Sequence, residues 1–369
     1  MICREYSCVY CIYMIESTKR LDQFEISLRM VENERSAWMY LGQIRPCEEN
    51  MAWLLLTLSC ILFWGVTDIL HKVSSDYNDP LSHYKTFVWI GIVMGLAGCV
   101  TMFVSDTLLD SVKMVKDNLY LIPLCVFYAI ALLFGLLGKK HLEASVVSPL
   151  ENIDGAIAAV ILYLFFLFTD RNHITENIGA MDMIGTVAIV IGVVFLGVQE
   201  HKLSKQEINL EEHKKRHRLG ALALIFPFLY NLVDVISIVA TSITVSEETE
   251  VAIPDIDFFF FESLGFFVVA ISLWLYMLVV KKYKYNPFRK KELIRCGAAT
   301  GETLGAMAYI FAVGINPILT VPITSAYCLV TIVLARIFLK EKLTRKQYFS
   351  LALLVVGIVL LGISGIVSA

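Results

Sequence analysis

The sequence predicts an all-α membrane protein, with ten transmembrane helices arranged as two inverted five-helix repeats. The first observation behind this prediction is composition. Hydrophobic residues make up 57% of the 369 positions and charged residues only 18%, whereas soluble proteins average about 45–50% and about 25%. A soluble domain of this size could not bury so much apolar surface, and a disordered chain would be far more polar. The class that remains is a protein embedded in lipid.

Ten apolar runs are the second observation. A helix needs roughly 20 mostly apolar residues to cross a bilayer, and these runs have about that length and are rich in Leu, Ile, Val and Phe. A transmembrane β-barrel would instead show alternating segments of about ten residues. In chain order, the predicted spans are 52–70, 86–104, 118–137, 144–168, 178–198, 219–243, 258–280, 296–314, 317–335 and 348–367.

The third observation is the distribution of basic residues. The odd-numbered loops between the predicted spans contain 22 of the 31 Lys and Arg residues, and the even-numbered loops contain 3. Cytoplasmic loops carry such an excess, so we expect the odd loops in the cytoplasm and both termini outside. No predicted span contains a Lys, an Arg or a His.

The chain divides into four predicted segments. Residues 1–50 contain no apolar run of spanning length and are predicted to be a dispensable N-terminal extension. Residues 51–198 form the first five-helix repeat and residues 219–369 the second. The longest and most charged loop, 199–218, is predicted to be a cytoplasmic linker between them.

The two halves show a weak internal repeat. In the first span Asp68 follows Trp64, and 166 positions later, in the sixth span, Asp234 follows Tyr230. Because each half has an odd number of spans, the second half must be inverted relative to the first. Inverted repeats are typical of secondary transporters, whose substrate site lies near the midplane between the halves.

Several short motifs also resemble those of a known family. They are Pro-Ile-Thr-Ser-Ala-Tyr at 322–327, Phe-Leu-Lys-Glu-Lys-Leu-Thr at 338–344, the glycines Gly357 and Gly362, and Phe-Trp-Gly at 63–65. With these motifs, residues 51–367 resemble the EamA-type branch of the drug/metabolite transporter superfamily. The matching segment of the first half, 168–172, lacks the family's Gly-Glu-Arg/Lys pattern. The resemblance implies carrier-type transport of small metabolites and names no substrate.

Six of the carboxylates within the predicted spans are the main functional candidates. A charge at a helix centre costs about 2.5–3.5 kcal/mol on insertion scales, so such residues face protein or a water-filled cavity. With no basic residue in the spans, we expect some of them to hold protons or to await a cation. We expect Glu262, near a span end, to reach the surface instead. The six are Asp68, Glu151, Asp154, Asp234, Glu262 and Glu302.

The fourth span is the most informative. Pro149 and Gly155 predict a broken helix there, and broken helices line the substrate sites of transporters. Glu151 and Asp154, three positions apart, lie on one helical face and are expected to share one proton. The residues that we predict to bind substrate or protons are Glu151, Asp154, Asn152, Ser148, Asp234, Asn231, Glu302, Asp68, Trp64, Tyr230 and Tyr327.

These observations predict a secondary transporter that works by alternating access. The cargo is expected to be a small polar metabolite, either cationic, zwitterionic or neutral, with protons as the candidate coupling ion. The lack of basic residues in the spans argues against bulky anions. The sequence shows no phosphate loop, catalytic triad or zinc spacing, so no cofactor, metal or catalytic residue is predicted, and no histidine relay inside the membrane.

Other functions remain open at this point. The rivals are a membrane-embedded enzyme and a structural or receptor protein, and within transporters a lipid-carrier flippase or a drug exporter. A net charge of −3 gives no basic excess for nucleic-acid binding. We expect a multi-pass protein of the cell membrane, specifically a bacterial inner membrane, with the lipid bilayer and a small-molecule substrate as partners. The direction of transport and the oligomeric state stay open.

Overall fold

The computed structural model describes residues 46–76, 78–105, 121–142, 144–169, 179–207, 223, 225–246, 253–287, 289–339 and 345–367. The chain forms two units, Met1–Glu49 and Asn50–Ala369, and the fold given below is that of the second. Residues 1–45 of the predicted extension lie outside the described residues, as do residues 208–218 of the predicted linker.

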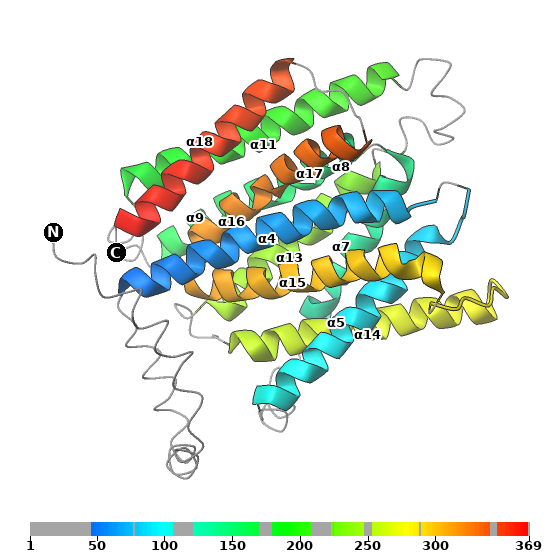
Figure 1. Cartoon of the computed structure of the whole chain (residues 1–369). Coiled ribbons are helices and arrows are strands. Elements are labelled where there is room, and N and C mark those ends of the chain that lie inside the picture. Colours follow the sequence, from blue (N-terminus) through cyan, green and yellow to red (C-terminus); the bar gives the residue numbers. More distant parts are fainter. Residues whose placement is uncertain are drawn as a thin grey trace, which may run out of the picture. The chain divides into compact units, whose positions relative to one another are not determined.

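All regular secondary structure in the described residues is helical (Figure 1). The apolar runs form helices because a helix satisfies its backbone hydrogen bonds internally, as a hydrocarbon environment requires. In chain order the helices are α4 (Pro46–Ser74), α5 (Ser82–Ser105), α7 (Leu121–His141), α8 (Ala144–Glu151), α9 (Ile153–Thr169), α11 (Ala180–Glu207), α13 (Ile225–Val245), α14 (Asp255–Val279), η5 (Lys290–Glu292), α15 (Leu293–Ile315), α16 (Pro317–Thr324), η6 (Ser325–Tyr327), α17 (Cys328–Leu334), the π-helix η7 (Ala335–Leu339) and α18 (Arg345–Val367).

Eight helical stretches are long and apolar enough to cross a membrane. They correspond to eight of the ten predicted spans, and two shorter apolar stretches, Ala180–Leu196 in α11 and Tyr348–Leu361 in α18, lie at the other two. The chain is therefore a multi-pass, all-helical membrane protein. The eight stretches are Ala52–Ser74, Ser82–Phe103, Pro123–His141, Val147–Thr169, Ile225–Val245, Asp255–Val279, Leu293–Ile315 and Pro317–Leu339.

Large apolar side chains cover the outside of the helices. Phe103 is 89% exposed, Phe168 84% and Phe228 64%. In water such a surface would drive aggregation, whereas lipid tails solvate it. This outward apolar face agrees with the membrane assignment that composition predicted.

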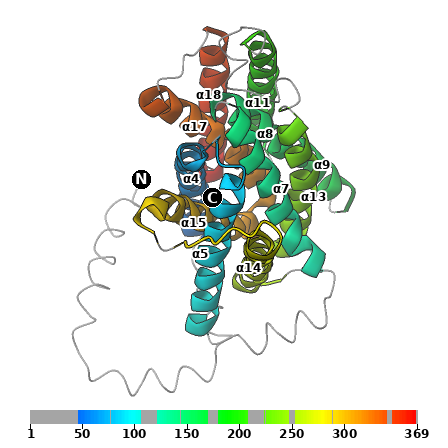
Figure 2. The ribbon, with the colours of Figure 1, turned by 90° about the vertical axis from the view of Figure 1, so that its right-hand side faces the viewer.

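The helices pack in pairs drawn from different parts of the chain. α5 lies against α14, α11 lies beside α18, and α7 lies against α13. Figures 1 and 2 both show α11 and α18 side by side. α15 packs on α5, as α14 packs on α7. The helix of the fifth predicted span, α11, continues to Glu207, well into the predicted linker, while its apolar stretch ends at Leu196.

Two spans are broken near their middle. In the fourth, Asn152 interrupts the helix between α8 and α9, three residues after Pro149. In the ninth, α16 contains Pro322 and ends in the 3₁₀ turn η6 before α17 begins. The predicted break of the fourth span is thus present. The ninth contains the same proline signal, and its break was not predicted.

The two broken spans touch. α9 packs on α16, and α8 packs on α17. A Cβ atom added to Gly155 would lie 2.6 Å from Cβ of Ser325, which is closer than side chains approach. Gly155 is therefore required by the close approach of α9 to η6, in addition to any loosening of its own helix.

The prediction that the spans contain no basic residue is wrong. Lys85, Lys139 and Arg295 lie in helices long and apolar enough to cross the membrane, and all three are at least 90% buried. The apolar runs end at these residues, but the helices continue for another turn. His71 likewise lies inside α4 and is fully buried, so the expectation that every histidine lies outside the spans is also wrong.

Candidate functional site

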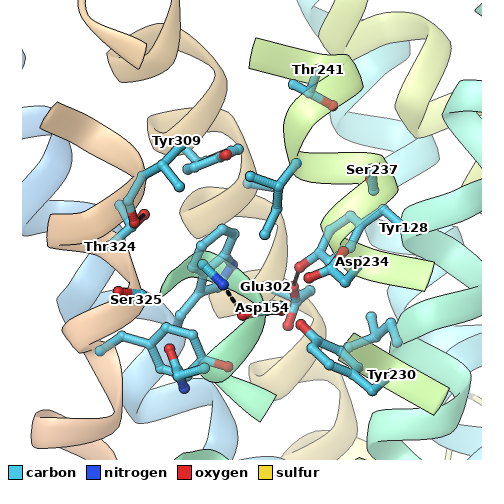
Figure 3. Close-up of a pocket in the computed structure, with 18 of the residues that line it drawn as sticks. Tyr128, Asp154, Tyr230, Asp234, Ser237, Thr241, Glu302, Tyr309, Thr324 and Ser325 are labelled. Carbon is cyan, nitrogen blue, oxygen red and sulfur yellow. Dashed lines mark hydrogen bonds between the residues drawn. The ribbon is translucent and has the colours of Figure 1, made fainter. Parts of the chain in front are cut away.

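A buried cavity lies among the helices of both halves of the chain. The predicted first half contributes α4, α7 and α9, and the second half contributes α13, α14, α15, α16 and η6. Figure 3 shows Tyr309, Thr324 and Ser325 on one side of the cavity and Tyr128, Tyr230 and Asp234 on the other. The volume of the cavity is about 60 Å³. Since one water needs about 10–15 Å³ by this measure, only a small solute fits without an opening of the helices.

Eight of the eleven predicted site residues line this cavity, and three do not. Ser148, Glu151 and Asn231 lie behind its wall. Sequence reasoning missed Tyr128, Lys139 and several hydroxyl residues, because a single polar residue in an apolar run gives no sign of where it points. The eight predicted residues that line it are Trp64, Asp68, Asn152, Asp154, Tyr230, Asp234, Glu302 and Tyr327.

The most consequential of the missed residues is Lys139, in the last turn of α7. Its Nζ lies 2.5 Å from Oε2 of Glu151 and 3.1 Å from Oδ1 of Asp68. Oδ2 of Asp68 accepts a further hydrogen bond, of 3.1 Å, from the Thr331 hydroxyl. All four residues are almost fully buried. This group of three charges (Asp68, Lys139 and Glu151), which we call the lysine triad, joins α4, α7 and α8.

The lysine triad changes the role predicted for Glu151. Glu151 was expected to share a proton with Asp154, but its carboxylate is neutralised by Lys139 instead. The carboxyl group of Asp154 lies within hydrogen-bonding reach of Asp234, on α13. The acidic pair of this site therefore joins α9 to α13, which belong to different halves of the chain.

In the part of the chain that the structure describes, only one of the two carboxyl oxygens of Asp234 has hydrogen-bond partners. The hydroxyl of Tyr230, one turn earlier on α13, lies within hydrogen-bonding reach of its carboxylate. Its Oδ1 atom is buried and finds no hydrogen-bond partner among the described residues. Oδ1 of Asn152 is in the same condition. Both residues line the cavity, so two unpaired acceptor atoms lie in its wall.

Two further acids complete the lining. The hydroxyl of Tyr128 donates a short hydrogen bond to Oε1 of Glu302. Glu262 was expected to reach the membrane surface, but it is 5% exposed and lines the cavity. Glu262 is buried because α14 packs along α5 and α7 and Glu262 lies on the buried face of α14.

Aromatic rings form a continuous wall beside these acids. The ring centroid of Trp64 lies 5.3 Å from that of Tyr309, 5.7 Å from that of Tyr327 and 6.4 Å from that of Tyr128. All four rings line the cavity. Trp64 can sit here because α15 has a glycine opposite it, since a Cβ atom on Gly305 would lie 2.4 Å from the indole ring.

Asn231 was predicted to bind substrate or protons, but its side chain hydrogen-bonds to the backbone at the break of the fourth span. In an unbroken helix the Asp154 N–H would donate to the Leu150 carbonyl, four residues earlier. Instead, Asp154 N–H donates to Oδ1 of Asn231 at 2.9 Å, and Nδ2 of Asn231 donates to the Leu150 carbonyl at 2.7 Å. One side-chain amide from α13 thus replaces the backbone hydrogen bond lost at the break.

Ser148 holds the other side of the break. Its carbonyl accepts hydrogen bonds from the backbone N–H of Asn152, at 3.0 Å, and from Nδ2 of the same residue, at 2.7 Å. Ser148 therefore orients Asn152, which lines the cavity and whose amide oxygen has no hydrogen-bond partner among the described residues.

The charges of the cavity do not balance when every acid is ionised. Asp68, Asp154, Asp234, Glu262 and Glu302 line it, and Lys139 is the single basic residue among its described lining. Lys139 is already paired on two sides. Buried charges need a partner or a proton, so the cavity can take up protons, a cation, or each in turn.

Comparison with known proteins identifies the fold alone. No protein-family model matches the sequence, and no curated protein matches it. A solved structure described as "Crystal structure of protein" has a similar fold, with a TM-score of 0.56 and 14% sequence identity. The match covers 84% of this chain and 96% of that one.

Proposed function

We propose that this protein is a secondary transporter that moves a small polar metabolite across the cell membrane by alternating access. The observation that carries the proposal is the buried acidic cavity, built from both halves of the chain and lined beside two broken helices. Broken helices around a midplane site are a recurring feature of transporters. A structural or receptor protein has no need of so many buried carboxylates, each of which costs stability.

The described helices support the proposed inverted repeat. α8 and α16 are both eight residues long, begin 173 positions apart and have proline at their sixth position. The contacts follow the same relation, because α9 packs on α16 as α8 packs on α17. Alternating access requires two related elements at the centre of a membrane protein, each of which can take up the arrangement of the other. The pair α8 and α16 meets this requirement and agrees with the resemblance to the EamA-type branch.

The cargo classes left open by the sequence are cationic, zwitterionic and neutral metabolites. Bulky anions are disfavoured by the excess of carboxylates in the cavity and by the pairing of Lys139 with two of them. Protons are the proposed coupling ion, with Asp154 and Asp234 as the groups that exchange them.

A ligand screen followed by transport tests the proposal. The full chain is purified and its thermal unfolding is followed against panels of cationic, zwitterionic and neutral metabolites, because a ligand that binds the folded state raises its apparent stability. Compounds that shift the unfolding temperature are then tested for uptake into proteoliposomes. We expect saturable uptake that a pH gradient stimulates. A ligand that binds and is never transported, under any gradient, would contradict the proposal.

A matched pair of variants shows whether the cavity is responsible. We expect Asp234→Asn to abolish the thermal shift and the uptake, because it removes an acid that lines the cavity. Asp76→Asn changes the same side chain in the loop between α4 and α5 and should leave both unchanged. Equal activity of the two variants would place the transport path elsewhere.

A further inference from the structure

We infer that the cavity selects small organic cations, either protonated amines or quaternary ammonium compounds, over zwitterions and neutral solutes. The inference deepens the proposed transport function and rests on it. Three features carry it: the pairing of the one lysine, the unused acceptor atoms, and the aromatic wall.

The lysine triad excludes a ligand carboxylate. A zwitterion needs a cationic group of the protein for its acidic end, and Lys139 is the one basic side chain among the described lining. Its ammonium group already contacts Glu151 at 2.5 Å and Asp68 at 3.1 Å. A ligand carboxylate would have to displace one of these, and a buried carboxylate would then be left without its partner. The positive charge of Lys139 is therefore used within the protein.

The remaining acids favour a cation. Asp154, Asp234, Glu262 and Glu302 line the cavity, and the described structure gives none of them an ion pair. The buried Oδ1 of Asp234 and Oδ1 of Asn152 have no hydrogen-bond partner there. These atoms accept hydrogen bonds and favour positive charge, whereas with a neutral solute the excess of acids is balanced by protons alone.

The aromatic wall supplies the second half of such a site. Ring faces attract a cation through their quadrupole, most strongly when water is excluded, and pockets for quaternary ammonium groups use this geometry. Trp64 lies 5.3 Å from Tyr309 and 5.7 Å from Tyr327, between ring centroids. Nε1 of Trp64 is a buried donor with no partner among the described residues.

Two matched sets of probes separate charge from shape. The first contains choline, its neutral isostere 3,3-dimethylbutan-1-ol and the zwitterion glycine betaine, and the second contains ethanolamine, ethylene glycol and glycine. The dissociation constants are measured by calorimetry on the full chain in nanodiscs. In at least one set, we expect the cation to bind at least tenfold more tightly than both other members.

Variants show where the cation binds. Asp234→Asn and Trp64→Leu should each weaken cation binding at least tenfold, because both residues line the cavity. Trp274→Leu is the matched control, since Trp274 lies on α14 outside the cavity and packs against a separate hydrophobic cluster. Where Asp234→Asn does not fold, Glu302→Gln replaces it, and the thermal unfolding of every variant is measured first.

The outcomes separate this inference from the proposed function. Tighter binding of a zwitterion or neutral probe, or failure of both cations to bind, overturns the inference, and saturable uptake of another solute would still support transport. Cation binding that neither Asp234→Asn nor Trp64→Leu weakens also overturns it. Cation binding at this cavity with no uptake into proteoliposomes supports the inference and contradicts the proposed function.

Discussion

Asn231 illustrates how much depends on a single side chain at the residue scale. Its amide is both donor and acceptor, as few side chains are, and it replaces the hydrogen bond between Asp154 and Leu150 at the break of the fourth span. The sequence predicted Asn231 as a residue that binds substrate or protons. It could not show that Asn231 faces the broken backbone, because that depends on how α13 packs against α8 and α9.

The first prediction is that Asn231→Leu destabilises the protein. Leucine has a similar size but cannot hydrogen-bond, so the Asp154 N–H and the Leu150 carbonyl are left buried without partners. Each such group costs about 1–3 kcal/mol. We expect a lower thermal unfolding temperature, measured in detergent. Asn78→Leu, at an exposed loop position, is the control and should unfold like the wild type. Equal stability of the two variants would show that the break needs no support from α13.

The second prediction concerns the lysine triad. Lys139→Met leaves Asp68 and Glu151 buried without their cation, and breaking a buried ion pair from one side costs about 3–5 kcal/mol. Adding Glu151→Gln removes one of the two unpaired charges, so the double variant should recover part of the stability. Size-exclusion profiles and thermal unfolding measure both effects. A Lys139→Met variant as stable as the control Lys281→Met, at an exposed site, would contradict the prediction.

At the element scale, the sequence predicted the positions of the helices better than their ends. Lys85, Lys139 and Arg295 were assigned to loops because the apolar runs stop beside them. Polar partners allow the helices to continue: Lys85 donates to the Tyr283 hydroxyl at 2.9 Å, and Arg295 donates to the Ser74 carbonyl at 2.8 Å. Hydropathy cannot anticipate such partners, because they come from distant segments of the chain.

The third prediction is that the two broken spans must approach closely. In Gly155→Ala the new methyl group would lie 2.6 Å from Cβ of Ser325, so α9 and η6 must separate. We expect loss of stability of about 1–3 kcal/mol, as for other overpacked sites, and loss of ligand binding. Ser325→Gly removes the opposing Cβ atom, and the next atom of that residue lies 3.5 Å away.

A double-variant cycle checks this prediction. If the contact is responsible, Gly155→Ala combined with Ser325→Gly should be more stable than Gly155→Ala alone. The loss of stability in the double variant should also be smaller than the sum of the losses in the two single variants. Additive effects of the two changes would show instead that Gly155 is needed for the flexibility of its own helix. Thermal unfolding of the four proteins measures the coupling.

At the scale of the whole molecule, the sequence identified the acids but not their pairs. Glu151 and Asp154 were paired because they are neighbours in one helix. In the structure, Glu151 pairs with Lys139 of α7 and Asp154 meets Asp234 of α13. Spacing along one helix can show which residues share a face. It cannot show which face meets which neighbour, and the charge of the cavity depends on that.

Polar contacts join the loops at one end of the bundle. Nζ of Lys85, in α5, donates to the Tyr283 hydroxyl at 2.9 Å, and Nζ of Lys140, in α7, donates to the Asp79 carbonyl at 2.8 Å. The first, third and seventh loops therefore lie together. This agrees with the alternation of basic residues, which assigns these loops to one side of the membrane.

The fourth prediction assigns that end to the cytoplasm, because cytoplasmic loops carry the excess of Lys and Arg. Single cysteines at Asn78 and Lys284, in a background without the nine native cysteines, should resist an impermeant maleimide in intact cells and react once the cells are opened. A cysteine at Ile315, at the far end of α15 from Arg295, should react in intact cells. The reverse pattern would invert the orientation but leave the cavity and its helix pairs unchanged. Reaction of only one of the two sites Asn78 and Lys284 in intact cells would contradict the even number of spans between the first and seventh loops, and with it the proposed inversion of the second half.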